Sequence, residues 1–166
     1  YFYTPEVFVA RKDWPNDEQD FSPEGLAGKG IAVPRATSTE YYLEDNYQDA
    51  RILIYDTFVD CMAALESKRA DLVFFDEASV AEELNFKPHN AKIVSEPIDA
   101  PNNEGFAIGV ALGNEQLLGR LQSALDKFRG TQGFLDLFDK YFGSSRRPYA
   151  LVKGVRPPTY REHRKR

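Results

Sequence analysis

The sequence contains almost no cysteine or histidine. Cys61 is the only cysteine among 166 residues, so no disulfide can form within the chain, and His89 and His163 are the only histidines. A structural zinc site made of cysteine and histidine takes four such ligands, which is more than the chain holds. These shortages exclude a disulfide-rich scaffold and a Cys/His zinc site, and we expect neither a metal nor a cofactor.

Long hydrophobic runs are also missing. No apolar run approaches the roughly 18 residues of a membrane span, and the first residues lack the basic-then-apolar pattern of a signal peptide. The chain opens instead on YFYTPEVFVARKD, in which VFVA (residues 7–10) already has the composition of a strand. We therefore interpret the chain as starting inside a longer protein. Its 42% of hydrophobic residues are enough to bury the core of about one soluble domain.

Positive charge is scarce except at the C-terminal end. Residues 146–166 carry eight Lys or Arg against the single Glu162, a net charge of +7, so the total of −5 leaves −12 on residues 1–145. An acidic body argues against a nucleic-acid partner. The basic tail could bind anionic lipid or nucleic acid, but we interpret it as a solubilising, flexible extension.

Strand and helix patterns alternate along the centre of the chain. This alternation predicts a three-layer α/β fold, with a parallel sheet covered by helices on both faces. From Thr57 to Lys68, the apolar residues Phe58, Cys61 and Leu65 share one helical face. Strand patterns cover residues 30–33, 51–55, 71–75 and 91–95, and helical patterns cover residues 39–47, 57–68 and 77–84.

The C-terminal part has a different organisation. GFAIGVAL (residues 105–112) has the composition of one more strand, and two amphipathic helices follow it over residues 114–130 and 131–143. We expect the first helix to turn its apolar residues inward: Leu117, Leu118, Leu121, Leu125 and Phe128. The predicted division of the chain is a hinge strand and linker (1–29), a ligand-binding α/β lobe (30–104), a returning hinge strand with the C-terminal helices (105–143) and a basic flexible tail (144–166).

Polar side chains follow three of the predicted strands where each strand ends. The stretch PRATST follows the first, Asp56 and Thr57 follow the second, and Asp76 and Glu77 follow the third. Ligands of open parallel sheets bind beyond the carboxyl ends of the strands. We therefore expect these side chains to converge at one edge of the sheet.

Two of these groups together match the charges of a free amino acid. Thr37 and Glu40 have the spacing of a capping box, and the hydroxyls of Thr37, Ser38 and Thr39 lie beside the free amides of a helix start, which suit a carboxylate. Asp76 would pair with an ammonium group. From spacing alone, an ordinary helix cap and a solvated strand end remain alternatives.

At these residues the chain resembles a known family. GLAGKGIAVPRATSTEYYLED, YDTFVDCMAALESKRADLVFFDEA and LQSALDKFRGTQGFLDLFDKYFG look like the second lobe and C-terminal helices of bacterial extracellular solute-binding proteins for polar amino acids. The resemblance implies one lobe of a two-lobed, periplasmic-binding-protein-like fold. It also implies a periplasmic or extracellular, non-enzymatic component of an ABC importer, with the membrane permease as its partner.

Several site residues follow from this resemblance. Ser38 and Thr39, with Thr37 beside them, match the positions that bind the ligand carboxylate, and Asp76 matches the aspartate that pairs with the α-ammonium. Ala36 departs from the family, which usually has glycine at this position. Most of the family's first lobe has no counterpart before VFVA, so we expect this chain alone to bind its ligand weakly and predict possible homodimer formation through the exposed hinge or half-cleft.

Two other functions remain as alternatives. The same lobe would serve as the extracellular sensor domain of a receptor or histidine kinase. The fold also resembles that of cyclohexadienyl dehydratases, in which Asp76 or Glu77 would be the only nearby acids. We prefer a non-catalytic binding protein because no complete acid/base pair can be assembled from one lobe.

Overall fold

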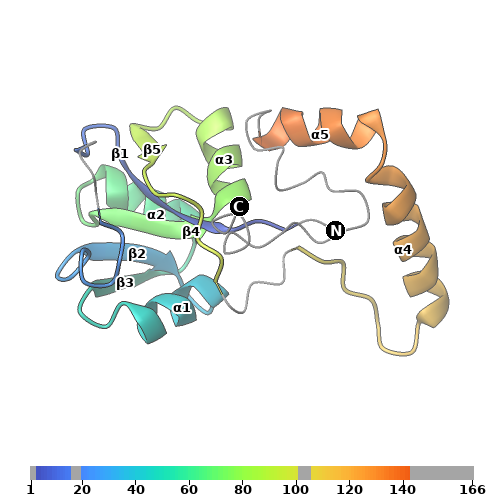
Figure 1. The fold of residues 1–166 in the computed structure, drawn as a ribbon, viewed down its shortest axis with the longest axis horizontal. Helices are drawn as coiled ribbons and strands as arrows, with labels where there is room; N and C mark the ends of the chain where they lie inside the picture. Colours follow the sequence, from blue (N-terminus) through green and yellow to red (C-terminus); the bar gives the residue numbers. More distant parts are fainter. Residues whose placement is uncertain (1–2, 16–19, 101–105, 143–166) are drawn as a thin grey trace, which may run out of the picture. The chain divides into compact units, whose positions relative to one another are not determined.

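The chain divides into two compact units. The computed structural model describes residues 3–15, 20–100 and 106–142 (Figure 1). One unit is Pro5–Asn103, and the other contains Tyr1–Thr4 and the chain from Glu104 onward. The predicted basic tail, residues 144–166, lies outside the described residues. No helix in the described part of the chain is long and apolar enough to cross a membrane.

The first unit is built on a five-stranded sheet with the order β3-β2-β4-β1-β5 (Figure 1). The central strands β2, β3 and β4 are parallel, as the alternation of strand and helix predicted. One helix connects β2 to β3 and another connects β3 to β4, and such crossover connections join strands that run in the same direction. The strands are β1 (Glu6–Arg11), β2 (Gly30–Pro34), β3 (Arg51–Tyr55), β4 (Leu72–Asp76) and β5 (Ala91–Ile93).

The prediction of a wholly parallel sheet was wrong for β1, and the sheet is mixed. β1 runs antiparallel to both of its neighbours, β4 and β5. Its first residue, Glu6, is paired with Asp76, the last residue of β4. A strand that begins at the edge where its neighbour ends must run in the opposite direction. β1, which we had placed with a hinge segment, is therefore an interior strand of the lobe.

Helices cover both faces of this sheet, as predicted. α1 (Ser38–Asn46) packs on one face against Phe8, Ile31 and Phe74 through the buried Leu43, and Tyr47, directly after the helix, belongs to the same cluster. α2 (Phe58–Glu66) and α3 (Glu77–Phe86) pack on the other face against alternate residues of the same strands, including Val7, Val9 and Val73. This separation follows from the two-residue period of a strand, which points successive side chains to opposite faces.

Cys61 belongs to the core of the α2 face, as its position in the helical pattern predicted. The side chain is fully buried, and burial, reinforced by the nearby Asp60, raises the pKa of its thiol to about 12. The nucleophilic thiolate is therefore almost absent at neutral pH. Cys61 fills space in the core, as a small apolar side chain would.

Two sequence-based predictions for the second unit need correction. Residues 107–111, inside the predicted strand 105–112, belong to no helix or strand, and Ile108 is 48% exposed. Helices α4 (Glu115–Phe128) and α5 (Gln132–Phe142) form as predicted, but no residue of α4 is buried within the described chain. A strand needs a paired neighbour and an apolar helix face needs a covering element, and composition specifies neither of these partners.

His89 joins the end of α2 to α3 inside the first unit. Its Nδ1 lies 2.8 Å from Glu66 Oε1, and its Nε2 lies 3.0 Å from Glu83 Oε1. Lys87 also donates to Glu83. Burial by itself would raise the pKa of Glu83, but the hydrogen bonds from Lys87 and His89 outweigh it and lower this pKa.

Glu83 should therefore contribute to acid sensitivity. A carboxyl with a lowered pKa in the folded chain stabilises the fold above its unfolded pKa, and this contribution is lost as the pH falls through the lowered value. We expect Glu83→Gln to lose less stability than the wild type between about pH 6 and pH 3, measured by urea unfolding. The exposed neighbour Glu82→Gln is the control, and an equal loss in Glu83→Gln and wild type would contradict this assignment.

Candidate functional site

Three helices begin at one edge of the sheet, directly after the parallel strands. The register pairs Ile31 with Leu72 and Ala32 with Val73, so β2 and β4 are neighbours whose carboxyl ends meet at this edge. Continued along both strands, this register puts Asp76 one residue beyond the level of Pro34. Neighbouring strands lie about 4.8 Å apart. The turn into α1 and the carboxylate of Asp76 are therefore close neighbours at one edge, as the sequence predicted.

The turn between β2 and α1 is held by its own side chains. Thr37 caps the helix, because its Oγ1 accepts a hydrogen bond from the Glu40 N–H at 3.2 Å. The Thr37 hydroxyl also lies 2.7 Å from the Pro34 carbonyl and 2.8 Å from the Thr39 hydroxyl. The Glu40 carboxylate accepts from the Ala36 N–H, which completes a variant of the predicted capping box.

These contacts divide the three predicted hydroxyls by role. Thr37 and Thr39 are committed to the turn, and Thr39 is buried. Ser38 is exposed in the first helical turn, where backbone amides have no partner within the helix. Within the predicted set, Ser38 is therefore the hydroxyl best placed to meet a ligand, while Thr37 and Thr39 support the backbone around it.

Ala36, where the resembled family has glycine, adopts a left-handed backbone conformation with a φ of 57°. A Cβ is unfavourable in this region and glycine is not. We expect Ala36→Gly to raise the free energy of unfolding by about 0.5–1 kcal/mol, measured by urea unfolding. Ala63→Gly, at an exposed position inside α2, should instead lower it by about 1 kcal/mol. Destabilisation by both substitutions would show that the turn is not strained.

Asp76 ends β4 and caps α3. Its Oδ1 accepts a hydrogen bond from the Ser79 N–H at 2.9 Å, so its local contact is that of a helix cap, which the alternative of a solvated strand end did not anticipate. Burial raises the pKa of Asp76, although its hydrogen bonds with Ser79 act in the opposite direction. A half-buried carboxylate of raised pKa is short of compensating positive charge, and a ligand ammonium group would supply that charge.

Asp56 stands two residues before α2, where its side chain would suit a helix cap, but it does not cap this helix. Thr57 is the N-cap of α2, since its Oγ1 accepts from the Asp60 N–H at 3.1 Å. Asp56 instead forms an exposed ion pair with Arg35, at 3.3 Å from its Nε. Spacing alone did not decide between two adjacent residues that both have capping side chains.

Buried polar groups gather at this same edge. Glu6, Thr39, Glu40 and Glu77 are buried, and they lie at the start of β1, in the first turn of α1 and at the start of α3. Sequence reasoning did not select Glu6. The signal was present, since a glutamate stands directly before the apolar stretch VFVA, at the start of a strand that is buried from Glu6 to Ala10.

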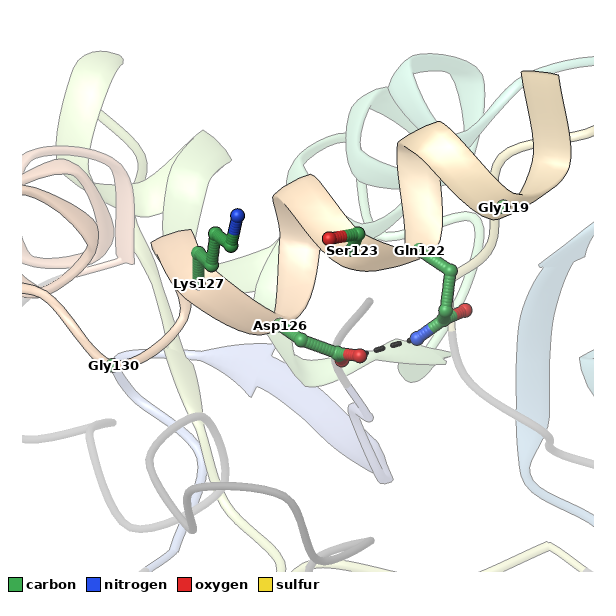
Figure 2. Close-up of a pocket in the computed structure, with 6 residues that line it drawn as sticks. All are labelled: Gly119, Gln122, Ser123, Asp126, Lys127 and Gly130. Carbon is green, nitrogen blue, oxygen red and sulfur yellow. Dashed lines mark hydrogen bonds between the residues drawn. The ribbon is translucent and has the colours of Figure 1, made fainter. Parts of the chain in front are cut away.

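Two hollows also lie in the second unit. A hollow of about 680 Å³ runs along α4, lined by Gly119, Gln122, Ser123, Asp126, Lys127 and Gly130. In Figure 2, the Gln122 side chain donates to Asp126 Oδ1 at 3.1 Å, along a single helix. Its lining residues come from one helix and the glycine after it, so it is open surface and encloses no ligand-sized space.

A second hollow, of about 370 Å³, lies in the second unit and is almost entirely apolar. Its lining is formed by Ile108, Leu125, Phe128, Phe134, Leu137, Phe138, Tyr141 and Phe142. This apolar hollow offers no charged side chain to an amino acid, and the hollow along α4 encloses no ligand-sized space. The chemistry that suits an amino acid is found at the sheet edge in the first unit.

No protein-family model matches the chain, but individual relatives do. ABC transporter arginine-binding protein 1 of Escherichia coli (strain K12) is 27% identical over 144 residues, which cover 86% of this chain and 57% of the relative. An arginine-binding periplasmic protein of Mannheimia haemolytica is 26% identical and covers the same shares of both chains. The chain therefore spans little more than half the length of these curated relatives.

Solved structures agree with these matches. An ancestral arginine-binding protein bound to glutamine matches with a TM-score of 0.68 and 26% identity, over 87% of this chain and 62% of that one. A Salmonella typhimurium periplasmic binding protein described for its high arginine specificity also has a TM-score of 0.68 and 26% identity, over 86% and 62% of the two chains. Over most of its length, the chain is similar in sequence and fold to the periplasmic arginine-binding proteins of ABC transporters.

Proposed function

We propose that the first unit binds a free amino acid at the edge where β2 and β4 end. The α-carboxylate would be held by Ser38 and the free amides at the start of α1, with Thr37 and Thr39 supporting the turn. The α-ammonium would pair with Asp76. The observation that carries this proposal is the placement of a helix N-terminus and a half-buried carboxylate on neighbouring parallel strands. Their spacing suits the two charges of one zwitterion.

Among amino acids, we propose a cationic one, with arginine first. Three buried carboxylates, Glu6, Glu40 and Glu77, lie at this edge beside Asp76, and no Lys or Arg is among the buried residues of the described chain. An excess of negative charge favours a ligand that carries additional positive charge. The names of the relatives support the same choice, since they are arginine-binding proteins.

The biological role we propose is the substrate-binding part of an amino-acid ABC import system, in the periplasm, with the membrane permease as partner. The relatives support this role over a receptor or kinase sensor, because they are components of transporters. They are also binding proteins and not enzymes, which argues against the dehydratase alternative. A homodimer through the exposed hinge or half-cleft remains a prediction, and sedimentation equilibrium would check it.

A thermal-shift and calorimetric screen of the twenty amino acids tests the binding proposal. A ligand that binds only the folded chain raises its melting temperature, and the rise increases with the ratio of ligand concentration to Kd. We expect arginine to give the largest shift, at high concentration because one lobe offers only one side of a cleft. Two arginine analogues separate the subsites: agmatine lacks the α-carboxylate, and N-acetylarginine lacks the α-ammonium. Both should bind more weakly than arginine, and a folded protein that responds to no amino acid would refute the proposal for this chain.

A further inference from the structure

Glu6 lies where the segment that enters the lobe contacts the segment that leaves it. The chain enters the first unit at Pro5 and leaves it after Asn103, so Glu6 is next to the entry point. Its backbone N–H donates to the Ile98 carbonyl at 2.8 Å, and the Ile98 N–H donates back to the Glu6 carbonyl at 2.7 Å. The entering and leaving segments are therefore joined to each other at this residue.

The side chain of Glu6 adds a further contact to the leaving segment. Only 1% of Glu6 is exposed, and its Oε2 accepts a hydrogen bond from the N–H of Ala100 at 3.3 Å. Ala100 is itself buried, with 3% exposed. A buried N–H without an acceptor is costly, and an apolar residue at position 6 would leave this one unsatisfied. A glutamine side chain has the same length and would still offer an acceptor oxygen to this N–H.

The same short segment is joined to the strand end that carries Asp76. Glu6 and Asp76 are directly opposite each other in the β1–β4 pairing, so their side chains leave the same face of the sheet. The Pro5 carbonyl accepts a hydrogen bond from the Glu77 N–H at 2.8 Å, at the first residue of α3. Residues 5 and 6 thus contact the leaving segment on one side and the β4–α3 junction on the other.

From these contacts we infer that Glu6 is a positioning residue for Asp76. Its hydrogen bonds link the entering segment to the leaving segment and hold both against the β4–α3 junction. A movement of either segment therefore shifts the position of Asp76. The effect on ligand affinity rests on the function proposed above. The link itself does not depend on that function and can be measured without a ligand.

Hydrogen exchange of single amides in the ligand-free protein tests this link. We expect Glu6→Ala to raise the exchange rates of the Ala100 and Glu77 amides by about tenfold, because one loses its acceptor and the other the support of residues 5 and 6. Glu6→Gln should restore rates close to wild type. If Glu6→Ala does not fold, Glu6→Asp shortens the side chain while keeping its charge, and we expect it to behave as the alanine variant should.

Ser95→Ala is the matched control. Ser95 Oγ accepts the Phe8 N–H at 2.8 Å, so this variant also removes one side-chain acceptor between β1 and the segment leaving the lobe, away from residues 98–100. It should raise the exchange rate of the Phe8 amide and leave the exchange rates of the Ala100 and Glu77 amides unchanged. Faster exchange at Ala100 with wild-type exchange at Glu77 in Glu6→Ala would overturn the inference, because Glu6 would then anchor only the leaving segment.

Arginine titrations of the same variants separate this inference from the proposed function. We expect Glu6→Ala to weaken arginine binding about tenfold more than Glu6→Gln, because both variants remove the charge but only glutamine keeps an acceptor for the Ala100 N–H, and Ser95→Ala to stay within about threefold of wild type. Equal affinity in Glu6→Ala and Glu6→Gln would overturn the positioning role. If wild-type protein binds no amino acid, the proposed function fails, and the exchange rates still decide whether Glu6 holds the β4–α3 junction.

Discussion

Replacing Asp76 with asparagine is expected to weaken arginine binding by about 10- to 100-fold, because the ligand ammonium loses a charge-assisted hydrogen bond in a half-buried site. Asparagine keeps the size of the side chain and its ability to cap α3. Isothermal titration of wild type and variant measures the ratio directly. The control is Glu82→Gln, which removes one negative charge from an exposed position on the same helix. Equal weakening in both variants would indicate general charge steering instead of a contact.

The same substitution should stabilise the ligand-free protein at neutral pH. Burial raises the pKa of Asp76, so its contribution to stability is fully present below the unfolded pKa and is lost as the pH rises through the folded pKa. At neutral pH the ionised carboxylate therefore opposes folding, and asparagine removes that cost. A higher melting temperature combined with lost binding is typical of a residue retained for function. A lower melting temperature would indicate that Asp76 serves mainly as a helix cap.

Phe8→Ala is expected to cost about 3–5 kcal/mol of folding free energy, a large part of the stability of a small domain. Phe8 is fully buried in β1, and its ring lies 4.7 Å from that of Phe74 and 5.5 Å from that of Phe21, measured between centroids. Few neighbours can move to fill the cavity, because β1 is hydrogen-bonded on both sides. Urea unfolding followed by circular dichroism measures the change.

Phe86→Ala is the control for this prediction. Phe86 is 56% exposed at the end of α3, so the same truncation should cost less than about 1 kcal/mol. A similar small loss for Phe8→Ala would mean that the α1 face of the lobe is loosely packed. In that case the ring contacts around Phe8 would contribute little to stability.

The accuracy of the sequence-based predictions depended on whether the information was local. The helix starts at Thr37 and Asp76 were predictable, because capping residues contact backbone amides three positions away. The burial of Cys61 followed from helical spacing. The role of Ser38 and Asp76 in binding is still a prediction. Their proximity to each other could be anticipated because parallel strands end at a common edge.

The predictions failed where the determining contact was distant in the chain. The direction of β1 depends on its pairing with β4 and β5, which its own composition does not encode. The apolar residues of α4 were expected to face inward, but Leu118 is 44% exposed in the described chain. Glu6 was overlooked for the same reason, since its significance comes from Ala100 and Asp76, which are remote in sequence.

The position of β1 has a consequence for how the lobe acquires its structure during synthesis. Of the five strands in this sheet, β1 is the first to be synthesised, yet it is inserted between β4 and β5, the last two. At a typical elongation rate of about 5–20 residues per second, the apolar segment Val7–Ala10 waits for several seconds without its partners. Pairing between segments so far apart is slow, and an unpaired apolar strand is prone to aggregate. The lobe's first-made strand is therefore the last to be secured, and protection of that strand by a chaperone would raise the yield of folded protein.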